Sequence, residues 1–261
     1  MGQQRFTGLP RTAKWRRLFE QLVTGEGLAS EDVRRLAALT VEAAATGFQR
    51  AEEDEGLRYT FYVLTEMGLA GQQPDWRSYL SGIGVQVADD PCPLDLTAGI
   101  QAAIDDHISA EAHPTDLGEI AQEAAGEALI TFAAVDASIL RRGRGELDHL
   151  MRRIASPTGF ARLGQLFFGL LTARFINFYL SRISADQVGT DRIPTIADLS
   201  RLNDALRGHC EKSASGAADD CRQWFVEAGW AEHPIQKAAG KLLSDALTGI
   251  RDVLLSEEAA E

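Results

Sequence analysis

The sequence predicts an all-α protein, a multi-helix bundle of roughly eight to ten helices around a central aromatic-rich helix. Three observations predict this fold: prolines punctuate the chain, the segments between them carry apolar residues at helical spacing, and one long segment is apolar on every face. Proline breaks a helix in its interior and is tolerated in the first turn, so each proline marks a helix boundary. The prolines stand at positions 10, 74, 91, 93, 114, 157, 194 and 234.

Residues that cap helix N-termini stand at three of these boundaries. Ser156 precedes Pro157, which suits an N-cap followed by proline at the first helical position. Thr115 precedes an acidic first turn, and Thr195 is followed three residues later by Asp198, a variant of the capping box. The pattern therefore predicts three clearly marked helix starts.

Apolar residues recur at three- and four-residue spacing in four segments, which predicts amphipathic helices with one face in the core. The four sets are Val33, Leu36, Ala37, Val41, Ala44 and Phe48; Leu117, Ile120, Ala124, Ala128, Phe132 and Val135; Ile196, Leu199, Leu202 and Leu206; and Leu243, Leu247, Ile250 and Leu254. The best candidate for a strand is residues 83–87, which alternate over a short stretch among glycines and prolines. We interpret this stretch as a loop.

The segment from Phe160 to Ile183 is apolar on nearly all sides. Such a helix lies in a protein core, in a membrane, or against another chain. A membrane span would place Arg174 in hydrocarbon, which is costly, so we prefer a central core helix. A partner interface stays open, and Phe167 and Phe175 on the aromatic stripe are its candidate interaction residues.

We interpret residues 1–261 as a single helical domain. A turn-rich connection at 189–194 contains Gly189 and Pro194 and is an alternative boundary between two bundles. Residues 256–261 are acidic and polar, and we expect a frayed tail there.

Composition indicates a globular protein of a reducing compartment. Hydrophobic residues make up 45% of the chain, which is enough to form a core and excludes disorder of the whole chain. The three cysteines are too few, and odd in number, for a disulfide framework. The first ten residues lack the apolar stretch of a signal peptide, so we expect a cytoplasmic location.

Charge is strongly segregated in a chain whose net charge is −12. Residues 78–140 contain eleven acids and no lysine or arginine, whereas residues 141–185 contain eight arginines and two acids. The first nineteen residues are also basic and free of acids. These blocks either neutralise each other between neighbouring helices or stay exposed and attract partners of opposite charge.

For exposed blocks, a polyanion or an acidic protein would bind the arginines, and a basic protein would bind the acidic helices. The candidate interaction residues of the basic block are Arg141, Arg142, Arg144, Arg152 and Arg153. The acidic net charge opposes nucleic-acid binding, because a local patch would have to neutralise phosphates against a repulsive background.

Carboxylate and histidine side chains at helical spacing give candidate metal ligands. One group lies within about two turns of a single predicted helix, and the other has the Glu-x-x-His spacing of di-iron bundles. The candidates are Asp105, Asp106, His107 and Glu111, with Glu146 and His149. A divalent metal bound there would activate water, which makes a helical metal-dependent hydrolase the alternative function. No second Glu-x-x-His occurs in the chain, and surface pairs account for the same spacing.

Other catalytic motifs are absent from the sequence. There is no Walker loop, no nucleophile elbow and no glycine-rich dinucleotide fingerprint. His209, Cys210, Cys221 and His233 lack the spacing of compact zinc sites, so we interpret the cysteines as buried thiols. We therefore assign no catalytic residue, no metal site and no cofactor.

The sequence thus favours a non-enzymatic interaction or scaffold subunit of a multiprotein or homo-oligomeric assembly. Its expected partner is another protein or a second copy of the chain. The metal-dependent hydrolase is the first alternative, and a membrane-acting effector or nucleic-acid-associated accessory protein is the third.

Overall fold

The computed structural model describes residues 12–24, 30–111, 113–135, 144–184, 187–191, 193–228 and 235–259. These residues form twelve helices and no strand, which confirms the all-α prediction. The helices are α1 (Ala13–Thr24), α2 (Ser30–Ala43), α3 (Ala45–Ala51), α4 (Glu55–Ala70), α5 (Trp76–Ser81), α6 (Pro93–Glu111), α7 (Asp116–Ala134), α8 (Arg144–Ile154), α9 (Pro157–Ser184), α10 (Ile196–Ser213), α11 (Ser215–Ala228) and α12 (Ile235–Ala259). The number exceeds the expectation because α3 and α5 have only seven and six residues, too few to show a helical period.

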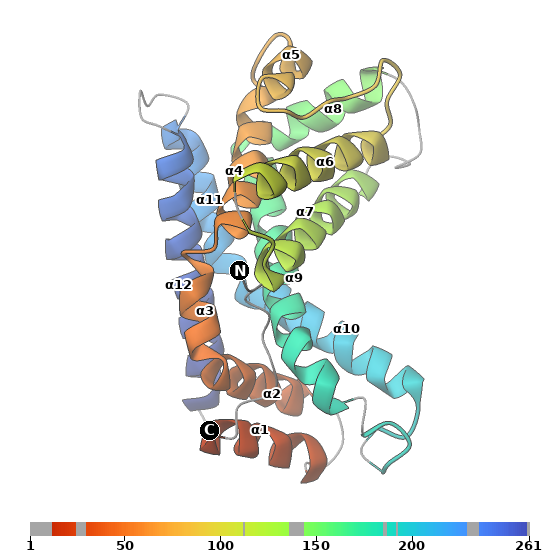
Figure 1. Ribbon diagram of the computed structural model, residues 1–261, viewed down its shortest axis with the longest axis vertical. Coiled ribbons are helices and arrows are strands. Elements are labelled where there is room, and N and C mark those ends of the chain that lie inside the picture. Colours follow the sequence, from red (N-terminus) through yellow and green to blue (C-terminus); the bar gives the residue numbers. More distant parts are fainter. Residues whose placement is uncertain are drawn as a thin grey trace.

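The long helix α9 runs through the middle of the bundle (Figure 1). It contacts α7, α10 and α11 most extensively, and α1, α2 and α8 as well. The helices α1 and α2 lie at one end of the molecule, whereas α5, α6 and α8 lie at the other (Figure 1). A single connected hydrophobic core includes residues from all twelve helices.

The aromatic residues of α9 lie inside this core. Phe167 and Phe175 are 0% and 3% exposed. Phe61 of α4 stacks on Phe167 with ring centroids 5.5 Å apart, and Phe48 of α3 meets Phe175 edge-on at 5.1 Å. The prediction of a central core helix is therefore confirmed, and the structure places both candidate interaction residues in the protein's own core instead of on a surface.

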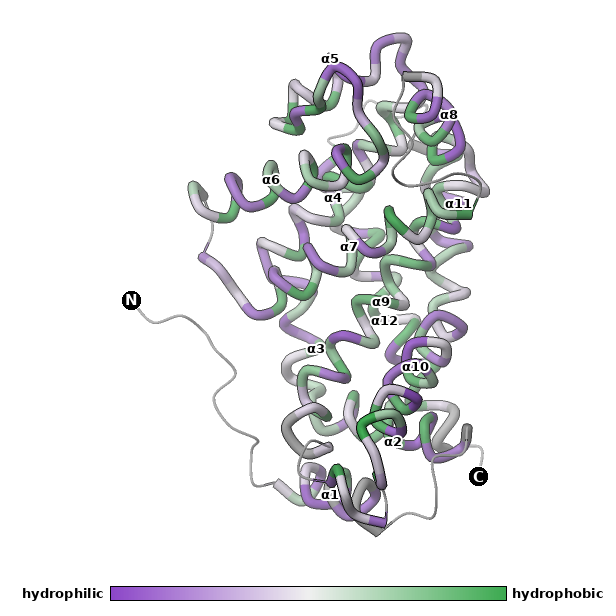
Figure 2. The backbone as a smooth tube through the Cα atoms, turned by 90° about the vertical axis from the view of Figure 1, so that its right-hand side faces the viewer, coloured by the Kyte–Doolittle hydropathy of each residue, from purple (hydrophilic) through white to green (hydrophobic). Residues whose placement is uncertain are grey.

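The apolar character of α9 also gives it the length and composition of a membrane span. Among the described helices, only the Pro157–Ser181 part of α9 meets these criteria, and 78% of the apolar window is buried within the protein. Hydrophobic residues follow α9 through the bundle, while the surrounding helices alternate hydrophobic and hydrophilic residues (Figure 2). A helix in a protein core can be as long and as apolar as a membrane span. The burial of α9 agrees with such a core helix.

The three predicted helix starts are confirmed with their capping bonds. The Ser156 hydroxyl accepts a bond from the N–H of Gly159 at 3.0 Å at the start of α9. Thr115 accepts a bond from the N–H of Gly118 at the start of α7, and Thr195 forms the full capping box with Asp198 at the start of α10. These bonds satisfy N–H groups that have no partner within the helix.

Two residues assigned to buried faces are exposed instead. Val135 is 70% exposed because it follows the last residue of α7. Ile196 is 77% exposed because it is the first residue of α10, and helical side chains point toward the N-terminus, here beyond the bundle. The face that begins at Val33 is buried as predicted, but it is shared by two helices, since Ala44 separates α2 from α3.

Connections and the C-terminus differ from expectation in one respect. Residues 85–88 have no regular structure, so the interpretation as a loop is confirmed.

At the alternative domain boundary, Val188 and Ile193 form an isolated bridge, and Ile193 belongs to the core. The helix α12 continues to Ala259 instead of fraying from residue 256, since glutamate and alanine favour helix.

The acidic and basic blocks meet where α7, α9 and α10 adjoin. Arg174 of α9 pairs with Glu123 and Glu127 of α7, the latter at 2.7 Å. Glu127 also pairs with Arg207 of α10. Part of the charge segregation is therefore neutralised within the molecule.

Replacing Arg174 by methionine is expected to lower the free energy of unfolding by about 1–3 kcal/mol, between the values for exposed and buried ion pairs. The variant keeps an apolar side chain, but it removes the ion pair of Glu123 and leaves Glu127 with Arg207 alone. Urea unfolding followed by circular dichroism measures the change. The matched control is Arg222→Met, which removes the exposed pair with Asp219. Equal losses in the two variants would contradict a stabilising network.

Candidate functional site

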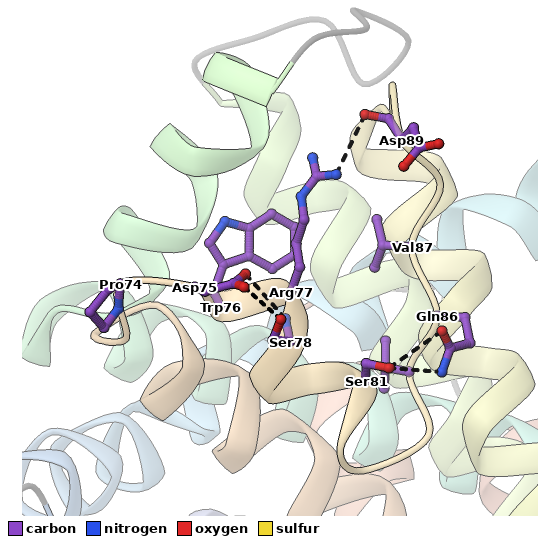
Figure 3. A pocket seen from close by; sticks show the side chains of 10 residues that line it. Pro74, Asp75, Trp76, Arg77, Ser78, Ser81, Gln86, Val87 and Asp89 are labelled. Atoms are coloured by element: carbon purple, nitrogen blue, oxygen red, sulfur yellow. Dashed lines mark hydrogen bonds between the residues drawn. The ribbon is translucent and has the colours of Figure 1, made fainter.

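A hollow of about 640 Å³ lies between α5 and the extended residues that follow it (Figure 3). We call it the α5 hollow. The helix side contributes Trp76, Arg77, Ser78 and Ser81, and the facing side contributes Val85, Gln86, Val87 and Asp89. Pro74 and Asp75 complete the lining, which is mostly polar.

Hydrogen bonds to two neighbouring helices position α5. The indole N–H of Trp76 donates to Asp148 of α8 at 2.8 Å. The Tyr79 hydroxyl donates to the carboxylate of Glu66 on α4 at 2.5 Å. Asp75 caps the helix by accepting bonds from the N–H and the hydroxyl of Ser78. These bonds fix a helix of six residues that is too short to be stable alone.

Glu66 is a buried carboxylate, only 4% exposed, that lies beside two tyrosines. Burial, reinforced by the neighbouring Glu66, raises the pKa of Tyr62 and of Tyr79 above the ordinary value. Both hydroxyls therefore stay protonated at neutral pH, and Tyr79 keeps the proton that it donates to Glu66. No sequence motif had indicated this cluster.

The extended segment is linked to α5 at both ends of the hollow (Figure 3). The Arg77 guanidinium donates through Nη1 to the carbonyl oxygens of Ala88 at 3.2 Å and Asp89 at 3.5 Å. At the other end, Gln86 Nε2 donates to Ser81 Oγ at 3.2 Å. The two sides of the hollow are thus connected without a disulfide or regular secondary structure.

Two glycines shape the loop that carries this segment. Gly84 has a φ of 90°, a left-handed conformation that favours glycine. Gly99 of α6 lies directly under the loop, because a Cβ at this position would stand 2.2 Å from the carbonyl oxygen of Gln86. The loop backbone therefore rests on α6 only because residue 99 has no side chain.

The candidate metal ligands on α6 point in different directions. Asp105 and Asp106 are exposed, and Asp105 accepts a bond from Gln122 of α7 at 2.8 Å. The His107 ring stacks nearly parallel on Tyr59 of α4, with centroids 3.5 Å apart. The structure therefore does not bring these three side chains to one point.

Of the three remaining candidate ligands, the structure describes the side chains of two. Glu146 and His149 lie on α8, and the Glu111 side chain is outside the described residues. Within the described ranges, no group of three or more histidine, cysteine or acidic side chains is placed to hold a metal ion. The hydrolase alternative gains no geometric support from the described side chains.

The structure describes the side chains of only two of the five arginines predicted as interaction residues, and both lie on α8. Arg153 is turned toward α7, where its Nη2 donates to the Phe132 carbonyl oxygen at 3.3 Å and its guanidinium lies 4.6 Å from the Phe132 ring. Arg152 is exposed. The described residues do not include Arg141, Arg142 or the side chain of Arg144. No continuous arginine patch is therefore defined by the described side chains.

The two cysteines of the C-terminal region are buried. Burial raises the pKa of Cys210 and of Cys221 to about 12 in each case. The thiols therefore stay protonated at neutral pH, as in the interpretation of buried thiols. His233, the last member of the zinc alternative, lies outside the described residues.

Four exposed carboxylates that form no ion pair with a described residue lie on α5, α6 and the loop between them. They are Asp75, Asp89, Asp105 and Asp106. Within the part of the chain that the structure describes, no lysine or arginine forms an ion pair with any of them. Hydrogen bonds from Ser78 lower the pKa of Asp75, which therefore stays ionised at neutral pH. We call these four residues the acidic end.

No protein-family model, curated protein or solved structure matches this chain. Of the acidic end, Asp75 and Asp89 line the α5 hollow (Figure 3), whereas Asp105 and Asp106 lie on α6 (Figure 1).

Proposed function

We propose that this protein is a non-enzymatic interaction subunit that binds a basic segment of a partner protein through its acidic end. One observation supports the proposal above all others. The acidic block is divided: the α7 acids Glu123 and Glu127 pair with Arg174, whereas Asp89, Asp105 and Asp106 form no ion pair with a lysine or arginine of the described residues.

Unpaired carboxylates at one end of a molecule create a negative potential that extends about one Debye length, roughly 8–10 Å, into physiological solvent. This potential speeds association with a basic partner and repels acidic ones. Two copies facing each other through this end would oppose like charges, so the proposal specifies a different protein as the partner.

Converting Asp89, Asp105 and Asp106 together to asparagine is expected to reduce recovery of the partner by roughly tenfold, because complementary charge controls encounter and selectivity. The measurement is quantitative mass spectrometry of complexes recovered under native conditions from cells that produce the tagged protein. The partner should carry a basic segment, and its recovery should fall as salt is raised.

The matched control converts Asp204, Asp219 and Asp252 to asparagine. These exposed residues lie on α10, α11 and α12, so net charge changes equally in a different part of the bundle. The proposal fails if both triple variants recover the same proteins in the same amounts. It also fails if the protein is recovered without any partner.

A further inference from the structure

We infer that the basic segment of the partner is an amphipathic helix that lies along the exposed face of α6, with apolar residues over the start of α6 and a lysine or arginine beside Asp105 and Asp106. The inference rests on the proposed function and specifies the conformation of the partner segment and the surface that it contacts. Three properties of this face support it: its exposure, the apolar side chains of its first half and the charge of its second half.

One face of α6 is open to solvent along almost the whole helix. The helix lies at the edge of the bundle (Figure 2) and packs against α4, α7 and α8 on its inner side. Its exposed residues fall within one sector of about 160°, because successive residues are about 100° apart around a helix. They are Leu94, Ala98, Ala102, Asp105, Asp106, Ser109 and Ala110. We call this sector the outer face of α6.

The first half of the outer face carries no charged side chain. A surface helix of a globular protein usually turns charged and polar residues toward solvent. The outer face instead begins with Leu94, which is 41% exposed, and continues with Ala98 and Ala102. Contiguous exposed apolar side chains are typical of a protein contact, and small ones let a second helix approach closely.

The end of α7 adds to this apolar surface. Gln122 of α7 donates to Asp105 at 2.8 Å. Gly126, one turn further along α7, lies against Gln101, one turn earlier in α6, so the two helices are antiparallel. Val135 directly follows α7 and therefore lies near the start of α6, where it is 70% exposed. The apolar half of the surface thus has large side chains from two elements.

Negative charge occupies the other half of the outer face. Asp105 and Asp106 are exposed, and neither forms an ion pair with a lysine or arginine of the described residues. The distance along the helix from Leu94 to Asp106 is about 18 Å, or roughly three turns. A partner that fits this surface therefore carries apolar residues over one stretch and a cation about three turns away.

A helical segment fits this surface because α6 is itself a helix. The backbone N–H and C=O groups within a helix bond each other, so the outer face offers no row of free backbone groups to an extended chain. Recognition then depends on side-chain packing. A second helix presents apolar residues every three or four positions along one stripe, which matches the spacing of the outer face.

The probe is a fluorescein-labelled peptide of about 18 residues with blocked ends, long enough for five helical turns. Leucines and alanines recur at three- and four-residue spacing on one face, and lysines follow on the same face near the C-terminus, where they favour helix. Fluorescence polarisation measures its affinity for the full chain. A peptide of the same composition, reordered so that it has no apolar face, should bind at least about tenfold more weakly.

Glutamine substitutions test the apolar half without changing charge. Ala98→Gln with Ala102→Gln adds bulk to the outer face and should weaken binding at least about tenfold, because a second helix can no longer approach closely. The matched control is Ala197→Gln with Ala205→Gln on α10, where both alanines are also exposed. Glutamine favours helix, so both variants should keep the wild-type circular dichroism spectrum.

Asparagine substitutions test the acidic half. Asp105→Asn with Asp106→Asn should weaken binding about tenfold at low salt and remove most of its salt dependence. Asp75→Asn with Asp89→Asn, outside the outer face, should change affinity much less. A diazirine-bearing leucine in the peptide should cross-link to α6 or Val135, and mass spectrometry of the digested product identifies the linked residues.

Equal affinity in the two glutamine variants would overturn the inference, as would equal binding of the reordered peptide or cross-links confined to other helices. In each of these cases the proposed function still stands if the native partner is lost from the triple variant of the acidic end. Failure of the proposed function is recognised separately, by native recovery without a basic partner.

Discussion

Replacing Phe167 by alanine is expected to lower the free energy of unfolding by about 3–5 kcal/mol, the range for removing a fully buried aromatic ring. Phe167 lies on α9 with no exposed surface and contacts the rings of Phe61 and Phe168, whose centroids are 5.5 and 5.2 Å away. Its removal leaves a cavity between α4 and α9 that neighbouring side chains fill only in part. Urea unfolding followed by circular dichroism gives the difference.

A partly buried ring on the same helix provides the control for this experiment. Phe178 packs against the edge of the core, so Phe178→Ala removes the same atoms where solvent already reaches the ring. Its effect should be less than half that of Phe167→Ala, since the lost contacts and the cavity are smaller. Equal effects would show that Phe167 is not the central residue that the structure describes.

Replacing Gly99 by alanine is expected to displace the loop from α6, because the new Cβ would stand 2.2 Å from the Gln86 carbonyl oxygen. We expect a loss of about 1–3 kcal/mol in the free energy of unfolding, as for other overpacked positions. Exchange of the Val85 amide, which bonds Leu80 at 3.0 Å, should become faster.

The control is the same substitution at Gly208 of α10, where nothing lies within 4 Å of the added carbon. Alanine favours helix over glycine by about 0.5–1 kcal/mol, so Gly208→Ala should stabilise the protein and leave the exchange of the Val85 amide unchanged. Wild-type stability and Val85 exchange in Gly99→Ala would show that the loop does not rest on α6 as described.

The core was predictable from sequence because local spacing determines it. The α9 segment carries apolar residues on every face, and burial is the only environment that suits such a helix in a water-exposed fold. The helix starts were predictable for the same reason, since a cap such as Thr195 bonds a residue three positions away. Val135 and Ile196 were misassigned because periodicity does not show where a helix ends.

The α5 hollow was not predictable, because its parts come from distant positions. Trp76 bonds Asp148, 72 residues away, and Glu66 meets Tyr79 across two helices. The helix α5 has six residues, too few to show a helical period in the sequence. Gly99 matters because a loop crosses it, and the spacing of residues does not predict the path of that loop. The sequence showed the charge blocks, but which acids meet Arg174 depends on how α7 packs against α9.

The surroundings of α9 have a consequence for any activity at a lipid bilayer. This helix packs against α1, α2, α7, α8, α10 and α11, its rings meet those of α3 and α4, and Arg174 connects it to two acids of α7. Withdrawing it would separate those charges and open the apolar faces of its neighbours to water at the same moment. We therefore expect α9 to leave the core only together with unfolding of the helices around it.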